Sequence, residues 1–116
     1  MKPGTSKPPR AQKFPRRGEV FWVALDPTLG REIRKTRPAL VVSPDEMNHA
    51  LGTVVLAPIK STVRDFPTRY TIRLQRKIAS VALDQIRTVS VERLLKRITT
   101  VDPAPALAIL REMFTV

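Results

Sequence analysis

The sequence contains no cysteine, a single histidine (His49) and four scattered glycines. Without cysteine, the chain forms neither a disulfide framework nor a thiolate metal site. The glycines are not grouped into a phosphate-binding loop, and no His, Asp and Glu residues have the spacing of metal ligands. One histidine of unknown placement does not assemble a Ser–His–Asp triad. These absences argue against disulfide-stabilised, nucleotide-binding and metal-dependent classes of protein.

Long apolar runs are also missing. No stretch is long enough to span a bilayer, and no apolar segment of a secretory signal follows the basic N-terminus. These features and the lack of cysteine favour a cytoplasmic protein. With 116 residues and 42% hydrophobic composition, the chain is expected to form one domain with one modest core.

Positive charge is what the chain has in abundance, with 21 Lys and Arg against 10 Asp and Glu, a net charge of +11. Residues 1–17 contain six basic residues, four prolines and no acid, a composition typical of disorder. We therefore expect a basic, Pro-rich disordered extension over residues 1–17 and a folded domain over residues 18–116. The charge on both parts favours a polyanionic partner and leaves open nucleic acid, an acidic protein segment or an anionic membrane surface.

Strand patterns dominate the chain from Gly18 onward. Apolar or alternating runs predict short strands, and the short connections favour antiparallel pairing. The expected strands cover residues 19–25, 39–43, 53–59, 69–74, 80–83 and 85–89. Phe21 and Trp22 are neighbours in the first strand and face opposite sides. One of them is expected in the core, and the other is available for base stacking or a dimer interface.

Helices are expected at three places. A short helical turn is predicted at residues 44–50. A longer helix is predicted at residues 90–98, where Ser90 is a plausible cap and the apolar residues have helical spacing. A third is predicted at residues 103–114, with Asp102 as its cap. The expected fold is mainly β with C-terminal helices (α+β), built as a small curved sheet or partly open barrel.

Polar side chains lie at the ends of two buried strands. Arg37 precedes a proline, which favours an extended backbone and places its side chain at the rim of the next strand. Lys60, Ser61 and Thr62 follow another buried strand. If the two strands are neighbours, a guanidinium and hydroxyl groups converge there as ligands for a phosphate group. The alternative interpretation is a structural ion pair between Arg37 and Glu32.

Several short motifs occur together at characteristic spacings. They are RGEVFWVALDPTLG at residues 17–30, TRPALVVSP at residues 36–44 and DQIRTVSVERL at residues 84–94. In combination they resemble the MazF/PemK family of type II toxin–antitoxin ribonucleases, from Arg17 to about Ile98. The resemblance implies a small SH3-like, CcdB/MazF-type β-barrel, usually a homodimer. It also implies a cytoplasmic enzyme without metal or other cofactor, which cleaves single-stranded RNA or mRNA and is inhibited by an acidic, MazE-like antitoxin.

The implied chemistry is attack of a ribose 2′-OH on the adjacent phosphate, which leaves a 2′,3′-cyclic phosphate and a 5′-OH. Such a reaction needs a proton acceptor, a proton donor and groups that stabilise charge on the phosphate. By resemblance Arg37 stabilises the phosphorane, Glu32 is a base or an ion-pair partner, and Asp84 is a catalytic carboxylate. The basic residue that the PemK-like branch carries two positions before that carboxylate is Ala82 here.

The phosphate-binding hydroxyl of the family falls at Lys60 by direct spacing, and Ser61 follows it. Either Lys60 binds the phosphate, or a one-residue shift brings in Ser61, which is then the fourth catalytic candidate beside Arg37, Glu32 and Asp84. The candidate RNA-binding residues are Arg31, Arg34, Lys35, Lys60, Thr62 and Arg87. Two alternatives remain on the same scaffold: a non-catalytic CcdB-like toxin that binds DNA gyrase, and a nucleic-acid-binding domain whose ribonuclease activity has decayed.

Overall fold

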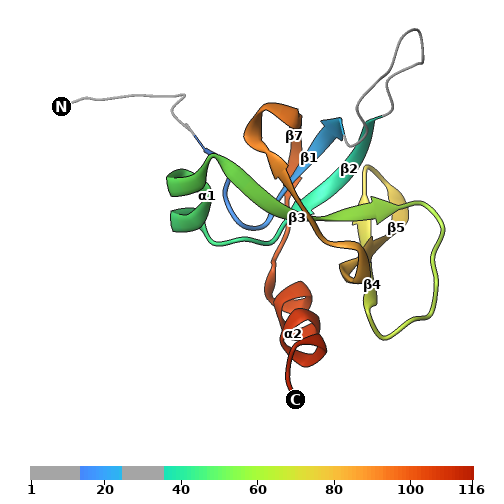
Figure 1. Ribbon diagram of the computed structural model, residues 1–116. Coiled ribbons are helices and arrows are strands. Elements are labelled where there is room, and N and C mark those ends of the chain that lie inside the picture. Colours follow the sequence, from blue (N-terminus) through green and yellow to red (C-terminus); the bar gives the residue numbers. More distant parts are fainter. Residues whose placement is uncertain (1–13, 25–35) are drawn as a thin grey trace, which may run out of the picture.

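The computed structural model describes residues 14–24 and 36–116 and shows a strongly curled sheet with one C-terminal helix (Figure 1). The expected mainly β fold is therefore confirmed. The strands are β1 (Glu19–Ala24), β2 (Thr36–Val41), β3 (Thr53–Lys60), β4 (Arg69–Leu74), β5 (Lys77–Ala82), β6 (Arg87–Ser90) and β7 (Leu94–Thr100). The α-helices are α1 (Asp45–Leu51) and α2 (Ala104–Met113), and the 3₁₀ turns are η1 (Leu83–Gln85) and η2 (Val91–Arg93).

Strand β3 lies at the centre of an antiparallel sheet with the order β4-β5-β3-β2-β1-β7. On one edge, β3 pairs with β2, with Ala39 opposite Pro58 and Val41 opposite Leu56. On the other edge, its first half pairs with β6 and its last two residues pair with β5. The end of β3 therefore lies where three strands meet, and this position holds the candidate site.

The core is divided between the two faces of the sheet. Because side chains alternate along a strand, Leu40 and Val42 pack into one cluster with Val20, Leu83 and other apolar residues. Ala39 and Val41 pack into the other cluster. Residues 39–43 are thus buried on both faces, as their continuous apolar run predicts.

The prediction of a helix at residues 90–98 is wrong. The cap itself is real, because the Ser90 hydroxyl accepts a hydrogen bond from the Glu92 amide at 3.2 Å. It caps only the single turn η2, however, and the chain then continues as β7, which pairs with β1. Strand β1 has an open edge that needs backbone partners, and the β-branched residues Ile98 to Val101 favour an extended chain.

The other two helices are confirmed. Helix α1 has Asp45 and Glu46 in its first turn, where the helix dipole favours acids, and it ends at Gly52, whose φ is 69°. At the start of α2, the Asp102 carboxylate accepts a hydrogen bond from the Ala104 amide at 3.0 Å, as expected of a cap. No α-helix in residues 14–24 and 36–116 is long and apolar enough to cross a membrane.

The folded part begins before the expected boundary at Gly18. The side-chain amide of Asn48, which is almost fully buried, donates to the Pro15 carbonyl at 3.0 Å. The Arg17 amide donates to the Asp45 carboxylate at 2.8 Å, and the Arg17 guanidinium donates to the Val42 carbonyl at 2.8 Å. Residues 14–17 are therefore tied to α1 and to the end of β2. Residues 1–13 lie outside the described residues, and their expected disorder stays a prediction.

Candidate functional site

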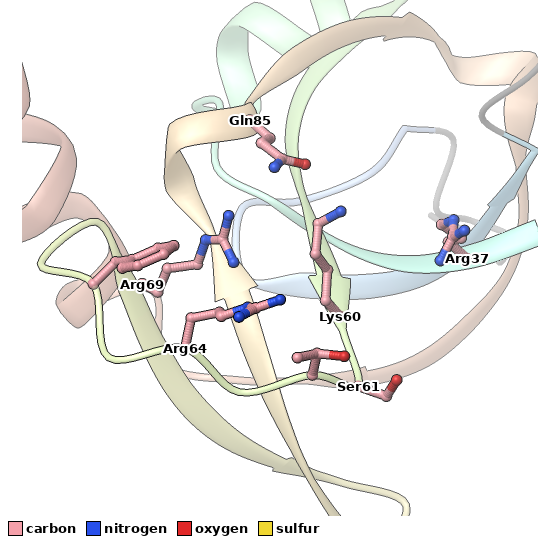
Figure 2. A pocket seen from close by; sticks show the side chains of 8 residues that line it. Arg37, Lys60, Ser61, Arg64, Arg69 and Gln85 are labelled. Atoms are coloured by element: carbon pink, nitrogen blue, oxygen red, sulfur yellow. The ribbon is translucent and has the colours of Figure 1, made fainter.

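A cavity of about 510 Å³ opens at the ends of β2 and β3 (Figure 2). Among its described lining residues, four are cationic and none is acidic. The side chains come from β2, from the end of β3 and the loop after it, from β4 and from η1. They are Arg37, Lys60, Ser61, Thr62, Arg64, Phe66, Arg69 and Gln85. A cavity with this lining is suited to a polyanion.

Arg37 and Lys60 lie at the same end of two neighbouring strands. Strands β2 and β3 are antiparallel neighbours, with Ala39 opposite Pro58. The pairing stops there, and Arg37, two residues before Ala39, and Lys60, two residues after Pro58, both line the cavity. Arg37 and residues 60–62 thus line one cavity, the arrangement that the sequence predicts for neighbouring strands.

The choice between Lys60 and Ser61 depends on where β3 ends. Within a strand, successive side chains face opposite sides, which would separate the two residues. Strand β3 ends at Lys60, and Ser61 lies in a bend after it. Both residues accordingly line the same cavity. Lys60 offers an ammonium group and Ser61 a hydroxyl donor to the cavity that the Arg37 guanidinium also lines.

A fixed ion pair forms one wall of the cavity. The Arg69 guanidinium donates from Nε to Oδ1 of Asp84 at 2.8 Å and from Nη2 to Oδ2 at 3.1 Å. The Thr68 hydroxyl donates to the same carboxylate at 3.0 Å. The Arg69 side chain is only 8% exposed, and its guanidinium lies 5.1 Å from the centre of the Phe66 ring, a cation–π distance.

The ion pair changes the protonation of Asp84. The hydrogen bonds from Arg69 lower the pKa of Asp84 to about 2, and the same contact raises the pKa of Arg69. Asp84 is therefore ionised at neutral pH. Arg69 lies directly opposite Ala82 in the β4–β5 pairing, so the cation beside Asp84 comes from the neighbouring strand.

A second cavity of about 340 Å³ shares Arg37, Lys60 and Ser61 with the first. Its remaining lining is mostly apolar and includes Trp22 from β1 and Ile78 from β5. Phe21, the neighbour of Trp22, packs against the core cluster of Ala39 and Val41. The three shared polar residues thus separate a cationic cavity from a largely apolar one.

The predicted site residues are only partly brought together. Arg37, Lys60, Ser61 and Thr62 line the cationic cavity, and Asp84 contacts it through Arg69. Arg87 is exposed on β6 opposite Leu56 and lines neither cavity. The other four candidates, Arg31, Glu32, Arg34 and Lys35, lie outside the described residues.

Sequence reasoning missed Arg64, Arg69 and Gln85 as lining residues. Arg69 occupies an outward position in the alternating pattern of residues 69–74. Asp84 lies 15 residues later, so no local sequence pattern indicates that the two side chains form an ion pair. Gln85 is adjacent to Asp84 in the DQ motif, which was the available clue. Over residues 14–24 and 36–116, no three His, Asp or Glu side chains form a group that would hold a metal ion.

The family model for the PemK-like, MazF-like toxin of type II toxin–antitoxin systems matches residues 16–113. The chain belongs to the PemK/MazF toxin family. This confirms the resemblance seen in the motifs.

Relatives named as endoribonucleases occur in several bacteria. Endoribonuclease MazF9 of Mycobacterium tuberculosis is 34% identical over 101 residues, which cover 77% of this chain and 84% of the relative. Endoribonuclease EndoA of Bacillus subtilis is 32% identical over 93 residues, covering 75% of this chain and 80% of the relative.

Solved structures of PemK/MazF toxins share the fold. MazF from Deinococcus radiodurans has 28% identity and a TM-score of 0.66, covering 87% of this chain and 93% of that one. A MazE–MazF structure from the same organism has 27% identity and a TM-score of 0.69, covering 85% of this chain and 90% of that one. The fold around the cationic cavity is therefore that of PemK/MazF toxins.

Proposed function

We propose that the chain is the endoribonuclease toxin of a type II toxin–antitoxin system and that it cleaves single-stranded RNA at the cationic cavity without a metal ion. The observation that carries the proposal is the convergence of Arg37 with Lys60 and Ser61 in one cavity. Membership of the PemK/MazF family and relatives named as endoribonucleases support it. Cleavage of mRNA in the cytoplasm would inhibit translation and growth.

In the proposed reaction, the ribose 2′-oxygen forms a bond to phosphorus while the bond from phosphorus to the 5′-oxygen breaks. The 2′-OH loses its proton to a base, and the leaving 5′-oxygen gains one. The products are a 2′,3′-cyclic phosphate and a 5′-OH. Arg37 stabilises the charge that develops on the nonbridging oxygens, and Ser61 and Lys60 hold the same phosphate.

Two carboxylates have different parts in this proposal. Glu32 is the candidate base, in line with the family resemblance. Asp84 is a poor proton acceptor at neutral pH, because its pKa is about 2 and Arg69 occupies both of its oxygens. We therefore assign Asp84 the role of holding Arg69 in the wall of the cavity.

The partners follow from charge and from the relatives. Solved relatives include MazE–MazF complexes and a mycobacterial endoribonuclease in complex with its cognate antitoxin. A net charge of +11 suits both an acidic antitoxin and an RNA backbone. Arg31, Arg34, Lys35, Thr62 and Arg87 are proposed as additional RNA contacts, and the active form is proposed to be a homodimer.

The test uses purified protein and a mixture of single-stranded RNAs in the presence of a chelator. Cleavage that leaves 5′-OH ends is expected for the wild type and is expected to be lost in Arg37→Ala. Arg111→Ala, a substitution of an exposed arginine on α2 away from the described cavities, is the matched control. Absence of cleavage by the wild type on every RNA, or retained cleavage by Arg37→Ala, would contradict the proposal.

A further inference from the structure

The cationic cavity carries more positive charge than one phosphodiester group needs. A phosphodiester has one negative charge and two nonbridging oxygens. Arg37, Lys60 and Ser61 are enough to bind such a group. Arg64 and Arg69 lie on the other side of Lys60 from Arg37 (Figure 2). Their placement leaves a second pair of cations for a second anion.

Arg69 is held in place before any ligand binds. Two of its five N–H groups are used by Asp84, and the guanidinium packs on the Phe66 ring. Three N–H groups, two on Nη1 and one on Nη2, have no hydrogen-bond partner among the described residues. Because the side chain is fixed and only 8% exposed, an anion that binds there requires little further ordering of Arg69.

Arg64 adds a second cation to the cavity. It lies in the loop between β3 and β4 and lines the same cavity as Arg69. No described acidic side chain forms an ion pair with it. In Figure 2, the side chains of Arg64 and Arg69 both extend toward the Lys60 side of the cavity. Asp84 neutralises one of these two charges, so the pair keeps a net positive charge for a ligand.

We propose that Arg64 and Arg69 form a second phosphate subsite. It binds the phosphodiester next to the one held by Arg37, Lys60 and Ser61. This inference rests on the proposed function, since a strand that places one phosphate at Arg37 presents the neighbouring phosphate along the cavity. Asp84 and Phe66 are positioning residues, because they fix the Arg69 guanidinium and do not contact the RNA phosphate themselves.

The experiment measures binding separately from cleavage. The ligand is a fluorescent single-stranded RNA with one 2′-deoxy residue at the mapped cleavage position, which removes the attacking hydroxyl. If the wild type cuts no RNA, an unmodified, unstructured RNA of the same length is used. The dissociation constant is measured by anisotropy over a range of salt concentrations for the wild type, Arg64→Gln, and the double variant Arg69→Gln with Asp84→Asn. The double variant avoids leaving an unpaired carboxylate, and thermal unfolding checks that each protein is folded.

Each lost phosphate contact is expected to reduce the slope of log K against log salt by about 0.7, the value for single strands. The dissociation constant at low salt should rise about tenfold. Arg111→Gln has the same charge change as Arg64→Gln, whereas the double variant keeps the wild-type net charge, and Arg111→Gln should leave the slope closer to that of the wild type. A methylphosphonate at the linkage next to the cleavage position should weaken binding to the wild type and have little effect on Arg64→Gln.

The two proposals fail in different ways. If the wild type cleaves RNA but Arg64→Gln and the double variant keep the wild-type salt slope and methylphosphonate sensitivity, the subsite is refuted and the ribonuclease proposal stands. If the wild type cuts no RNA but the slope falls in both variants and not in Arg111→Gln, the subsite stands and the ribonuclease proposal is refuted.

Discussion

Gly18, in the RGEV segment that opens β1, should tolerate no side chain. Its φ is 97°, outside the left-handed region that other residues can enter. A Cβ at this position would lie 2.8 Å from the backbone carbonyl oxygen of Val101. That oxygen cannot easily move away, because the Val101 amide donates to the Gly18 carbonyl at 2.8 Å. The strand β1, the end of β7 and the entry to α2 therefore meet too closely at Gly18 for alanine.

Gly52 provides the matched comparison. It also has a positive φ, 69°, but a Cβ there would meet no atom within 4 Å. Gly52→Ala should therefore cost only the conformational penalty, about 1 kcal/mol. Gly18→Ala adds the backbone clash to a less accessible conformation and should cost about 3 kcal/mol or more.

Urea denaturation followed by circular dichroism measures both free energies of unfolding. The expected result is a much lower midpoint for Gly18→Ala than for Gly52→Ala, with similar m-values. Equal losses in the two variants would refute the reasoning, because the close approach to Val101 would then have no energetic consequence.

Four further substitutions test the core, the tether, the ion pair and the site. Leu56→Ala, at a fully buried position in β3, should cost about 3 kcal/mol in urea denaturation; a loss well under 1 kcal/mol would contradict its burial. Asn48→Ala should cost about 2 kcal/mol and make the backbone near Pro15 accessible to limited proteolysis; an unchanged digestion pattern would argue against the tether. Asp84 has a folded pKa of about 2 against an ordinary 3.8, so its contribution to stability is present above about pH 4 and lost as the pH falls toward 2. Asp84→Asn should flatten the pH dependence of stability in that window, and an unchanged acid profile would contradict the ion pair. Ser61→Ala should reduce cleavage about 100-fold and RNA binding much less, and equal losses in both would indicate a purely binding role.

The sequence is informative where a pattern is local. Alternation and continuous apolar runs correctly predict β2, β3 and β4, because burial of one or both faces controls which residues those strands use. The segment at residues 90–98 shows the limit of such patterns. Leu94 and Ile98 are four residues apart, which suits one face of a helix and also one face of a strand. The pairing of β7 with β1 determines the outcome, and no local pattern reports it.

The candidate site is likewise predictable from the sequence only in part. Arg37 and residues 60–62 are predictable because each sits at the end of a recognisable strand. The ion pair between Arg69 and Asp84 is not predictable, since it depends on the register of the β4–β5 hairpin. That register is fixed by a tight turn in which Gln75 and Arg76 have φ values of 49° and 69°. Glycine or asparagine usually marks such a turn, so these two residues give no signal.

The central position of β3 has a consequence for how the molecule opens. Its neighbours β2, β5 and β6 cover both of its edges, and most of its side chains are buried. Its amide hydrogens should therefore exchange with solvent only when the whole domain unfolds, whereas those in the loop at residues 61–68 should exchange through local opening. Lys60, at the end of β3, thus belongs to the most persistent part of the structure, and Arg64 belongs to a part that is free to adapt. Substitutions in that loop could therefore alter which ligands the cavity binds without disturbing Lys60 at its edge.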